Sequence, residues 1–335
     1  MKNNILPKEF IKISESIGKN HLLVQGAGGN TSLKYSNEMW IKASGKWLAK
    51  ASKENIFVSV DYKKIKNDIL KNKLSIKELH LFKKSKLKPS IETSLHALMP
   101  HKVVLHSHPI NVLSTITKKN FEKKLSSLMT DINWAWVPYI RPGYDLTKIV
   151  KKKLSKKIVD VIFFGNHGLI IGANNCKDCY KLMNKIINRF KTNPRKFSFI
   201  NNIKFKVLAK NLKMKLPKYE IAHSLALDKI SFNYCKNKNG ILYPDQTVFL
   251  GKKMNCFTLS QINKLRKNSF DYIIIKNIGV LISQNTKKDI DELLRGHAEL
   301  LLRIKEREKL RYLKKTEIKQ LHNWDAEKFR QGKIK

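Results

Sequence analysis

Acidic side chains are scarce in this sequence. Its 335 residues include 68 Lys and Arg but only 26 Asp and Glu, which gives a formal net charge of +42. The basic residues are mostly lysines spread along the chain, whereas a specific nucleic-acid binder more often concentrates Arg, Gly and aromatic side chains on one element. We therefore interpret the charge as a solvated surface that attracts anionic small molecules, and we expect no specific nucleic-acid partner.

Long apolar runs are also missing. No run approaches the ~20 residues that span a bilayer, and the opening MKNNILPKEF lacks the apolar core and cleavage site of a signal peptide. We expect a cytoplasmic protein with no membrane partner. Because 42% of the residues are hydrophobic, the chain can bury one large core or two modest ones, which argues against wholesale disorder.

Cysteine is sparse as well. The four cysteines are Cys176, Cys179, Cys235 and Cys256. Reduced thiols are expected in a chain of this length without a secretion signal. The first two form a single C-x-x-C where a helix is predicted to begin, after Asn174 and Asn175. Two buried small side chains are the expected role, and a structural zinc or redox pair is the alternative.

Alternating apolar runs and turns predict a mixed α/β chain. We expect an apolar strand at HLLVQ, a glycine turn, a second strand at NTSLKY and a third strand from Met39. A helix is predicted over residues 90–98 with Ser90 as its N-cap, followed by a strand over 102–107. The run VIFFGNHGLIIG predicts a hairpin, a helix from Cys176 to about Phe190 follows, and RFKTNPRKFSFINN resembles a linker.

The second half of the chain contains an echo of the first. Asn166–Ile171 aligns with Asn277–Ile282 at an offset of 111 residues, and in each copy an apolar strand leads into a helix. We interpret this as a partial duplication, with chance similarity as the alternative. Since Ile278 replaces His167, the second copy can keep the packing but not a metal ligand. We predict a metal-binding domain over residues 1–200 and a C-terminal companion region, a degenerate repeat, over 201–335.

Three histidines predict a metal site. His106 and His108 are two residues apart at the end of a β-branched run, so a strand directs both imidazoles to one face. His167 lies 59 residues later in a glycine turn. Three His ligands leave a fourth position open, which is typical of catalytic zinc. Alone, H-x-H is a weak signal, and a histidine in a glycine turn often only caps backbone groups.

A carboxylate precedes the histidines. Glu92 lies fourteen residues before His106, and helix-then-strand order can return it over the metal as a general acid/base. The alternative is a surface carboxylate in the first turn of a helix, stabilised by the helix dipole. His96 and His101 are assigned to structure, because a strand-borne pair is already available.

A glycine turn offers donors to a phosphate. Gly26–Asn30 fails the G-x-G-x-x-G pattern because Thr31 holds the sixth position, and the sequence has no Walker motif. Backbone N–H groups of such a turn, with the side chains that follow it, still suit an anion. Ser44 and Gly45 can supply a second arc, and Ser90 a third hydroxyl.

Five ordered motifs together resemble the class II aldolase/adducin family: GAGGNTS, IKASGK, PSIETSLHA, VVLHSHP and FGNHGL, over about residues 10–195. The resemblance implies a three-layer α/β/α fold with a mainly antiparallel central sheet, often assembled as a homo-oligomer, in particular a tetramer. It also implies three zinc-binding histidines, one acid/base carboxylate and a phosphate cradle. In this sequence the matching residues are His106, His108 and His167 for zinc, Glu92 for the acid/base, and Asn30, Ser44, Gly45 and Ser90 for phosphate.

Two departures bear on the function. Ile91 stands where the fuculose-phosphate aldolase pattern has a second serine, and epimerases of the family have Asp where this chain has Glu92. SIETSLHALMPHKVVLHSHP and the late NWDAEKFR look especially like the aldolase part of rhamnulose-phosphate aldolase/dehydrogenase proteins. Those proteins continue into a dehydrogenase domain, whereas this sequence ends soon after Arg330, so the resemblance does not carry a dehydrogenase activity over to it.

The resemblance predicts a zinc-dependent lyase that cleaves a ketose 1-phosphate, or a similar sugar phosphate, to dihydroxyacetone phosphate and an aldehyde. Ligand type alone also allows other divalent metals. A decarboxylase or dehydratase acting on a sugar acid or sugar phosphate is one alternative, and a non-catalytic adducin-like interaction module is another. Tyr139 and Tyr144 are candidates for the tyrosine that a neighbouring subunit often contributes in this family.

Overall fold

The computed structural model describes residues 6–73, 80–82, 85–200, 203–262 and 270–333. The chain divides into two compact units. The first comprises Met1–Ile116, Asn120–Lys191 and Asn323–Lys335, and the second comprises Thr117–Lys119 and Thr192–His322. Whether residues 1–200 and 201–335 fold as separate domains stays a prediction.

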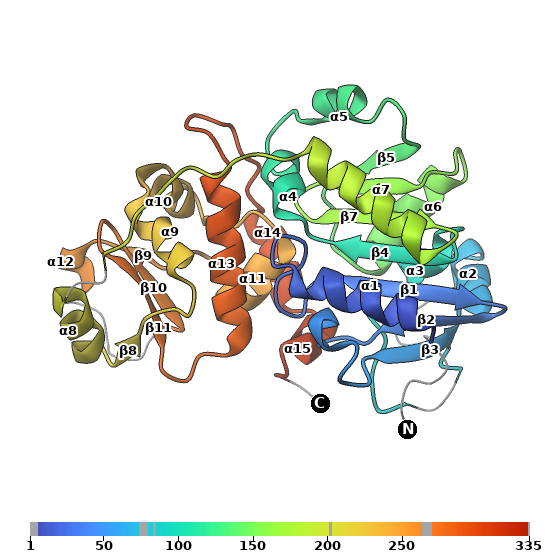
Figure 1. Cartoon of the computed structure of the whole chain (residues 1–335), viewed down its shortest axis with the longest axis horizontal. Helices are drawn as coiled ribbons and strands as arrows, with labels where there is room; N and C mark the ends of the chain where they lie inside the picture. Colours follow the sequence, from blue (N-terminus) through green and yellow to red (C-terminus); the bar gives the residue numbers. More distant parts are fainter. Residues whose placement is uncertain (1–5, 74–79, 83–84, 201–202, 263–269, 334–335) are drawn as a thin grey trace. The chain divides into compact units, whose positions relative to one another are not determined.

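A seven-stranded sheet forms the centre of the first unit, in the order β3-β2-β1-β4-β7-β6-β5 (Figure 1). Neighbouring strands are antiparallel except for β5 and β6, which are parallel. The strands are β1 (Asn30–Tyr35), β2 (Glu38–Lys42), β3 (Phe57–Asp61), β4 (Val103–Ser107), β5 (Trp134–Val137), β6 (Val161–Phe164) and β7 (Gly168–Ala173).

Helices cover both faces of this sheet (Figure 1). On one face α1 (Lys8–Lys19) packs beside α7 (Cys176–Arg189), and on the other α3 (Thr93–Leu98) packs between α2 (Tyr62–Leu70) and α6 (Tyr144–Leu154). Because helices cover it on both sides, β4 is buried along its whole length. The predicted three-layer α/β/α fold with a mainly antiparallel sheet is confirmed.

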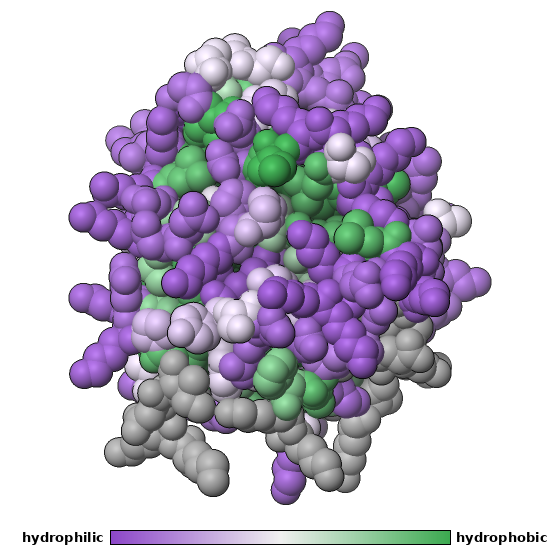
Figure 2. Space-filling model, turned by 90° about the vertical axis from the view of Figure 1, so that its right-hand side faces the viewer, coloured by the Kyte–Doolittle hydropathy of each residue, from purple (hydrophilic) through white to green (hydrophobic). Residues whose placement is uncertain are grey.

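The outer surface follows the composition. Figure 2 shows one face of the molecule, where hydrophilic side chains predominate and the apolar patches are small and surrounded by polar groups. Among the residues that the structure describes, no helix is both long and apolar enough to cross a membrane.

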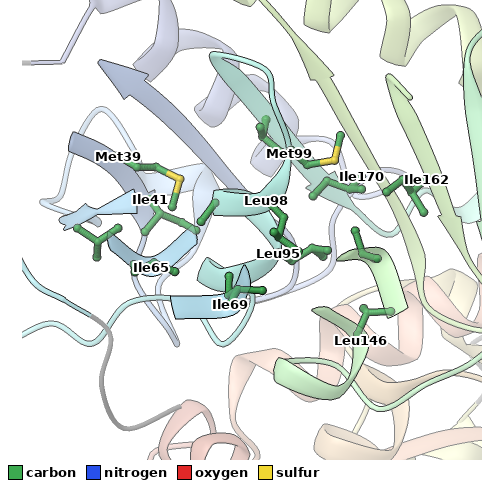
Figure 3. Packing of buried hydrophobic residues seen from close by; sticks show 14 of the residues in the cluster. Met39, Ile41, Ile65, Ile69, Leu95, Leu98, Met99, Leu146, Ile162 and Ile170 are labelled. Carbon is green, nitrogen blue, oxygen red and sulfur yellow. The ribbon is translucent and has the colours of Figure 1, made fainter. Parts of the chain in front are cut away.

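A large apolar cluster lies between the sheet and the layer formed by α2, α3 and α6 (Figure 3). Ile65 and Ile69, one helical turn apart on α2, face Met39 and Ile41 on β2. These side chains are at most 1% exposed, and each contributes about 1.5–3 kcal/mol through burial of apolar surface. This core fixes α3, and with it the segment that carries Glu92, against the sheet.

Two local predictions are wrong. Residues 21–25 form turns rather than a strand, because Leu23 and Val24 both donate to the Asn20 carbonyl oxygen while the Leu23 oxygen accepts from the His108 amide. The helix expected from Ser90 begins at Thr93 instead. The other predicted elements of the first unit are present, including a helix N-capped by the Asn175 side chain, which accepts from the Asp178 amide at 2.8 Å.

The cysteines are unpaired thiols. Burial raises the pKa of Cys176 to about 11 and raises that of Cys179 further. Both are therefore neutral side chains packed at the start of α7, as expected for a structural role.

The second unit has its own four-stranded sheet, in the order β8-β11-β10-β9. Its strands are β8 (Met214–Lys215), β9 (Cys256–Phe257), β10 (Tyr272–Ile275) and β11 (Gly279–Ser283). The helices and short turns that accompany them are α8 (Ile203–Asn211), η2 (Glu220–His223), α9 (Ser224–Leu227), α10 (Lys229–Lys236), α11 (Pro244–Leu250), α12 (Leu259–Ile262), α13 (Lys288–Leu302) and α14 (Lys315–His322).

The sequence echo corresponds to a recurring backbone turn. Asn166 has φ 53° and Gly168 has φ 157° between β6 and β7, while Asn277 has φ 59° and Gly279 has φ 154° between β10 and β11. Asparagine and glycine tolerate such backbone angles better than other residues. In each unit the antiparallel pair leads into a long helix, α7 or α13. These observations support the interpretation of a partial duplication.

Candidate active site

Two of the three predicted histidines meet at the end of β4. His106 is the fourth residue of this strand, and His108 lies just beyond its end. Their Nε2 atoms are 3.0 Å apart, and the two side chains are almost fully buried. The alternation of side chains along an extended segment places both rings on one face, as the spacing predicts.

His167 joins this pair from the turn between β6 and β7. Its ring centroid lies 4.9 Å from that of His106 and 5.1 Å from that of His108. Gly168 makes the approach possible, because a β-carbon built there would lie 2.4 Å from the Ser107 carbonyl oxygen. Any larger residue would force the turn away from β4. The three imidazoles each offer one nitrogen within 4.8 Å of the others, so this buried group can hold a metal ion.

The donor chemistry fits a divalent cation. The Nδ1 atom of His106 lies 2.9 Å from the Leu169 carbonyl oxygen, which fixes the proton on Nδ1 and leaves the Nε2 lone pair directed at the other rings. Two nitrogens bound to one tetrahedral zinc are about 3.3 Å apart, close to the spacing of the His106 and His108 Nε2 atoms. Three converging imidazoles, one of them oriented by a backbone carbonyl, are a donor set that suits zinc.

Glu92 lies directly beside the histidines. Its Oε2 atom is 3.2 Å from Nε2 of His106, its Oε1 atom is 3.6 Å from Nε2 of His167, and its side chain is 5% exposed. Asn30 donates from Nδ2 to Oε2 at 2.8 Å. Glu92 is therefore a buried, oriented carboxylate at the N-terminal boundary of α3, and the alternative of a surface carboxylate is wrong.

The residues predicted to bind phosphate are brought together. Asn30 also donates from Nδ2 to Oγ of Ser90 at 3.2 Å, and the Ser44 amide donates to the Lys88 carbonyl oxygen at 2.9 Å. A bridge between Ala43 and Pro89 joins the same two segments. We refer to Asn30, Ser44, Gly45 and Ser90 as the cradle. Gly45 has φ 74°, a conformation that favours glycine.

Lys42 is a residue that the sequence reasoning missed. Its ammonium group is buried and donates to the carbonyl oxygens of Ala27 and Lys46, at 2.9 and 2.6 Å. It therefore connects the glycine turn to the loop that contains Gly45. Lys42 is one of many lysines, so its residue type alone does not single it out. The signal that could have found it is its position directly before the Ala-Ser-Gly turn.

The other two histidines of this region are structural, as predicted. His96 is buried and its Nδ1 atom lies 2.7 Å from Oγ of Ser32. Burial, and then the neighbouring His106, hold the pKa of His96 well below its usual range, so the ring is neutral. His101 lies 2.9 Å from Asp160 through Nε2.

A curated relative from Bacillus subtilis (strain 168), "Uncharacterized oxidoreductase YuxG", is 30% identical over an alignment of 201 residues that covers 54% of this chain and 29% of that protein. The chain therefore spans less than a third of this relative's length.

Solved structures are also similar. One is the N-terminal class II aldolase domain of a conserved protein from Thermoplasma acidophilum, with 27% identity, 57% of this chain and 97% of that chain covered, and a TM-score of 0.48. Another is an L-fuculose 1-phosphate aldolase, with 17% identity, 62% and 90% covered, and a TM-score of 0.41.

A family model decides the membership. The model described as "Class II Aldolase and Adducin N-terminal domain" matches residues 8–193. These residues contain the histidine trio, the buried carboxylate and the cradle. The chain belongs to the class II aldolase and adducin family.

Proposed function

We propose that this protein is a metal-dependent lyase that cleaves a ketose 1-phosphate, or a similar sugar phosphate, to dihydroxyacetone phosphate and an aldehyde. The observation that carries the proposal is the position of Glu92, a buried carboxylate within 3.2–3.6 Å of two imidazoles of the trio. This carboxylate lies against the predicted metal ligands and is oriented by a hydrogen bond from Asn30.

We propose His106, His108 and His167 as the ligands and zinc as the metal. When bound, the cation supplies a Lewis acid that polarises the substrate carbonyl. Glu92 then exchanges the proton at the substrate carbon whose C–C bond is broken in cleavage, the carbon that becomes the nucleophile in the reverse direction. The hydrogen bond from Asn30 holds Oε2 in place, so the other oxygen of Glu92 is the one suited to accept and return this proton.

The cradle would bind the phosphate group. Backbone amides of the glycine turn and hydroxyls of Ser44 and Ser90 suit phosphate oxygens. The buried ammonium of Lys42, bonded to the Ala27 carbonyl oxygen of the same turn, adds electrostatic attraction. Because Asn30 contacts both Ser90 and Glu92, a phosphate in the cradle would lie one side chain away from the proton-transferring group. This fits a substrate whose phosphate is close to the carbonyl carbon.

The other parts of the proposal follow the family. We propose a homo-oligomer, with a tetramer as the expected form, acting on carbohydrates in the cytoplasm, and Tyr139 or Tyr144 as an assisting side chain. An adducin-like module without catalysis is disfavoured, because the three imidazoles expected to bind the metal and the expected carboxylate, Glu92, are all present and lie together. A decarboxylase or dehydratase would use the same residues, so the substrate decides between them.

The test is a panel of ketose 1-phosphates and sugar acids offered to the purified protein. Dihydroxyacetone phosphate is detected by a coupled assay, carbon dioxide separately, and metal content by elemental analysis. We expect about one divalent ion per chain and release of dihydroxyacetone phosphate from at least one ketose 1-phosphate. Release of carbon dioxide from a sugar acid, without aldol cleavage, would replace the proposal with the decarboxylase.

A further inference from the structure

The final helix among the described residues packs on the first unit at two places, one of them in the cradle. This helix, α15 (Asp325–Arg330), belongs to the first unit although the second unit precedes it in the sequence. At its end, a β-carbon built on Gly45 would lie 3.4 Å from the Arg330 carbonyl oxygen. Figure 1 shows α15 beside the segment that follows β2. The helix therefore rests on the second arc of the cradle.

The start of the same helix packs on Gly143, close to the backbone of Ile91. A β-carbon built on Gly143 would lie 2.6 Å from Cη2 of Trp324 and 3.6 Å from the carbonyl oxygen of Ile91. Ile91 stands between Ser90 of the cradle and the proposed acid/base Glu92. Trp324 and Arg330 thus contact two segments, at Gly143 and at Gly45, that are far apart in the sequence. Only glycine at position 143 leaves space for the indole ring.

Two cations contact aromatic rings of this segment, and one of them, Arg141, also forms an ion pair with Asp145. The Lys88 ammonium lies 4.0 Å from the ring centroid of Phe329, and the Arg141 guanidinium carbon lies 5.0 Å from that of Trp324. Both distances are within the range of cation–π attraction. Lys88 also accepts the hydrogen bond from the Ser44 amide through its carbonyl oxygen, so the same residue joins the cradle to α15.

The inner face of the helix carries a buried ion pair between two of its own residues. Nη1 of Arg330 lies 3.4 Å from Oε2 of Glu327, and the two side chains are 10% and 1% exposed. Taking both charges out of water is costly unless the groups are well packed and hydrogen-bonded. Such a pair is compatible with one docked position of the helix rather than with loose association.

We propose that the segment Trp324–Arg330 is a wall of the phosphate site. It keeps Lys88 beside the cradle and makes the site selective for phosphorylated over unphosphorylated substrates. The physical reason is that an aromatic wall displaces water, which lowers the local dielectric constant and strengthens attraction between a phosphate and nearby cations and amides. This inference rests on the proposed function for the identity of the substrate, but not for the binding of the anion.

The first test uses inorganic phosphate and the full-length protein. Phosphate affinity is measured by calorimetry, and hydrogen exchange of the peptide covering residues 323–333 is measured with and without phosphate at constant ionic strength. At a phosphate concentration of ten times Kd, exchange in this peptide should slow by about 10-fold, because the ligand favours the docked state. Unchanged exchange in the wild-type protein would overturn the proposal.

The second test uses variants. Trp324→Leu and Lys88→Met should each weaken phosphate binding by about 10-fold, the scale of a desolvated cation–π contact. Lys328→Ala is the matched control, since Lys328 lies on the same helix, is 38% exposed and pairs with Asp325; its affinity should stay within about twofold of wild type. Thermal unfolding checks that each variant is folded, and Phe329→Leu replaces Trp324→Leu if the latter is not.

A kinetic measurement separates the two proposals. With a cleaved ketose 1-phosphate, Trp324→Leu should raise KM by about 10-fold with little change in kcat, the signature of lost ground-state binding. It should leave KM for the unphosphorylated sugar unchanged. Wild-type KM and phosphate affinity in Trp324→Leu would refute the wall while leaving the lyase intact. Phosphate-dependent protection without any lyase activity would refute the proposed reaction while leaving the wall intact.

Discussion

Replacement of Glu92 by glutamine gives the most direct test of the proposed chemistry. Glutamine has nearly the same shape, and its carbonyl oxygen can accept the 2.8 Å hydrogen bond that Asn30 now donates to Oε2. The side chain is 5% exposed. Because glutamine fills the same volume as glutamate, the substitution leaves no cavity at this buried position. The change therefore isolates the ability of the carboxylate to take up and return a proton.

The expected loss in kcat is about 10²–10⁴-fold, the contribution typical of a general acid/base, or about 3–5.5 kcal/mol of transition-state stabilisation. The metal should remain bound, because the three imidazoles and not the carboxylate are its proposed ligands. Turnover is measured with the coupled assay for dihydroxyacetone phosphate, and metal content by elemental analysis of the same samples.

Glu54→Gln is the matched control, since Glu54 is 37% exposed and forms an ion pair with Lys50 at 2.6 Å. Its kcat should stay within about twofold of wild type. If Glu92→Gln turned over at the wild-type rate, Glu92 would be a structural carboxylate. If it lost the metal as well, Glu92 would be a ligand rather than the acid/base.

Three further predictions concern the metal, the turn and a buried lysine. His167→Ala should abolish stoichiometric metal binding, and equal metal content in variant and wild type would contradict the site. Gly168→Ala should weaken metal binding by about 10-fold or more, since the new β-carbon would lie 2.4 Å from the Ser107 carbonyl oxygen; a metal titration measures this. Burial, and secondarily Lys66, lowers the pKa of Lys34 to about 7, so the unfolded state binds more protons than the folded state between about pH 7 and 10.5, and stability rises with pH there. Lys34→Met should therefore raise Tm relative to wild type at pH 6, with a smaller gain near pH 10, and a gain that grew with pH would show that burial of the ammonium is not the cause.

The predictable part of this protein rests on local patterns. The H-x-H at the end of a β-branched run and the histidine in an Asn-His-Gly turn predicted the trio, because strand alternation and turn chemistry act over a few residues. The apolar runs predicted β4, β6, β7 and α7 for the same reason. The echo at Ile278 was also readable, since the two turns share the asparagine and glycine that their backbone angles require.

Local patterns failed where long-range contacts compete with them. The apolar run at residues 21–25 has the composition of a strand, but its carbonyl groups bond to the chain around His108 instead. Ser90 has the chemistry of an N-cap, yet its hydroxyl accepts from the Asn30 side chain and the Glu92 amide. At residues 21–25 a partner from elsewhere in the fold replaced the local one, and at Ser90 a distant partner, Asn30, was added to the local one.

The sequence by itself determined which groups can bind a metal and how each is presented on its strand or turn. Tertiary structure decided which groups meet. Packing of α3 on the sheet brings the Glu92 carboxylate to His106, and return of the chain end brings Arg330 to Gly45 of the cradle. The physical reason is that periodicity and turn propensity describe a few neighbouring residues, whereas approach across more than two hundred residues depends on the total burial and hydrogen bonding of the folded unit.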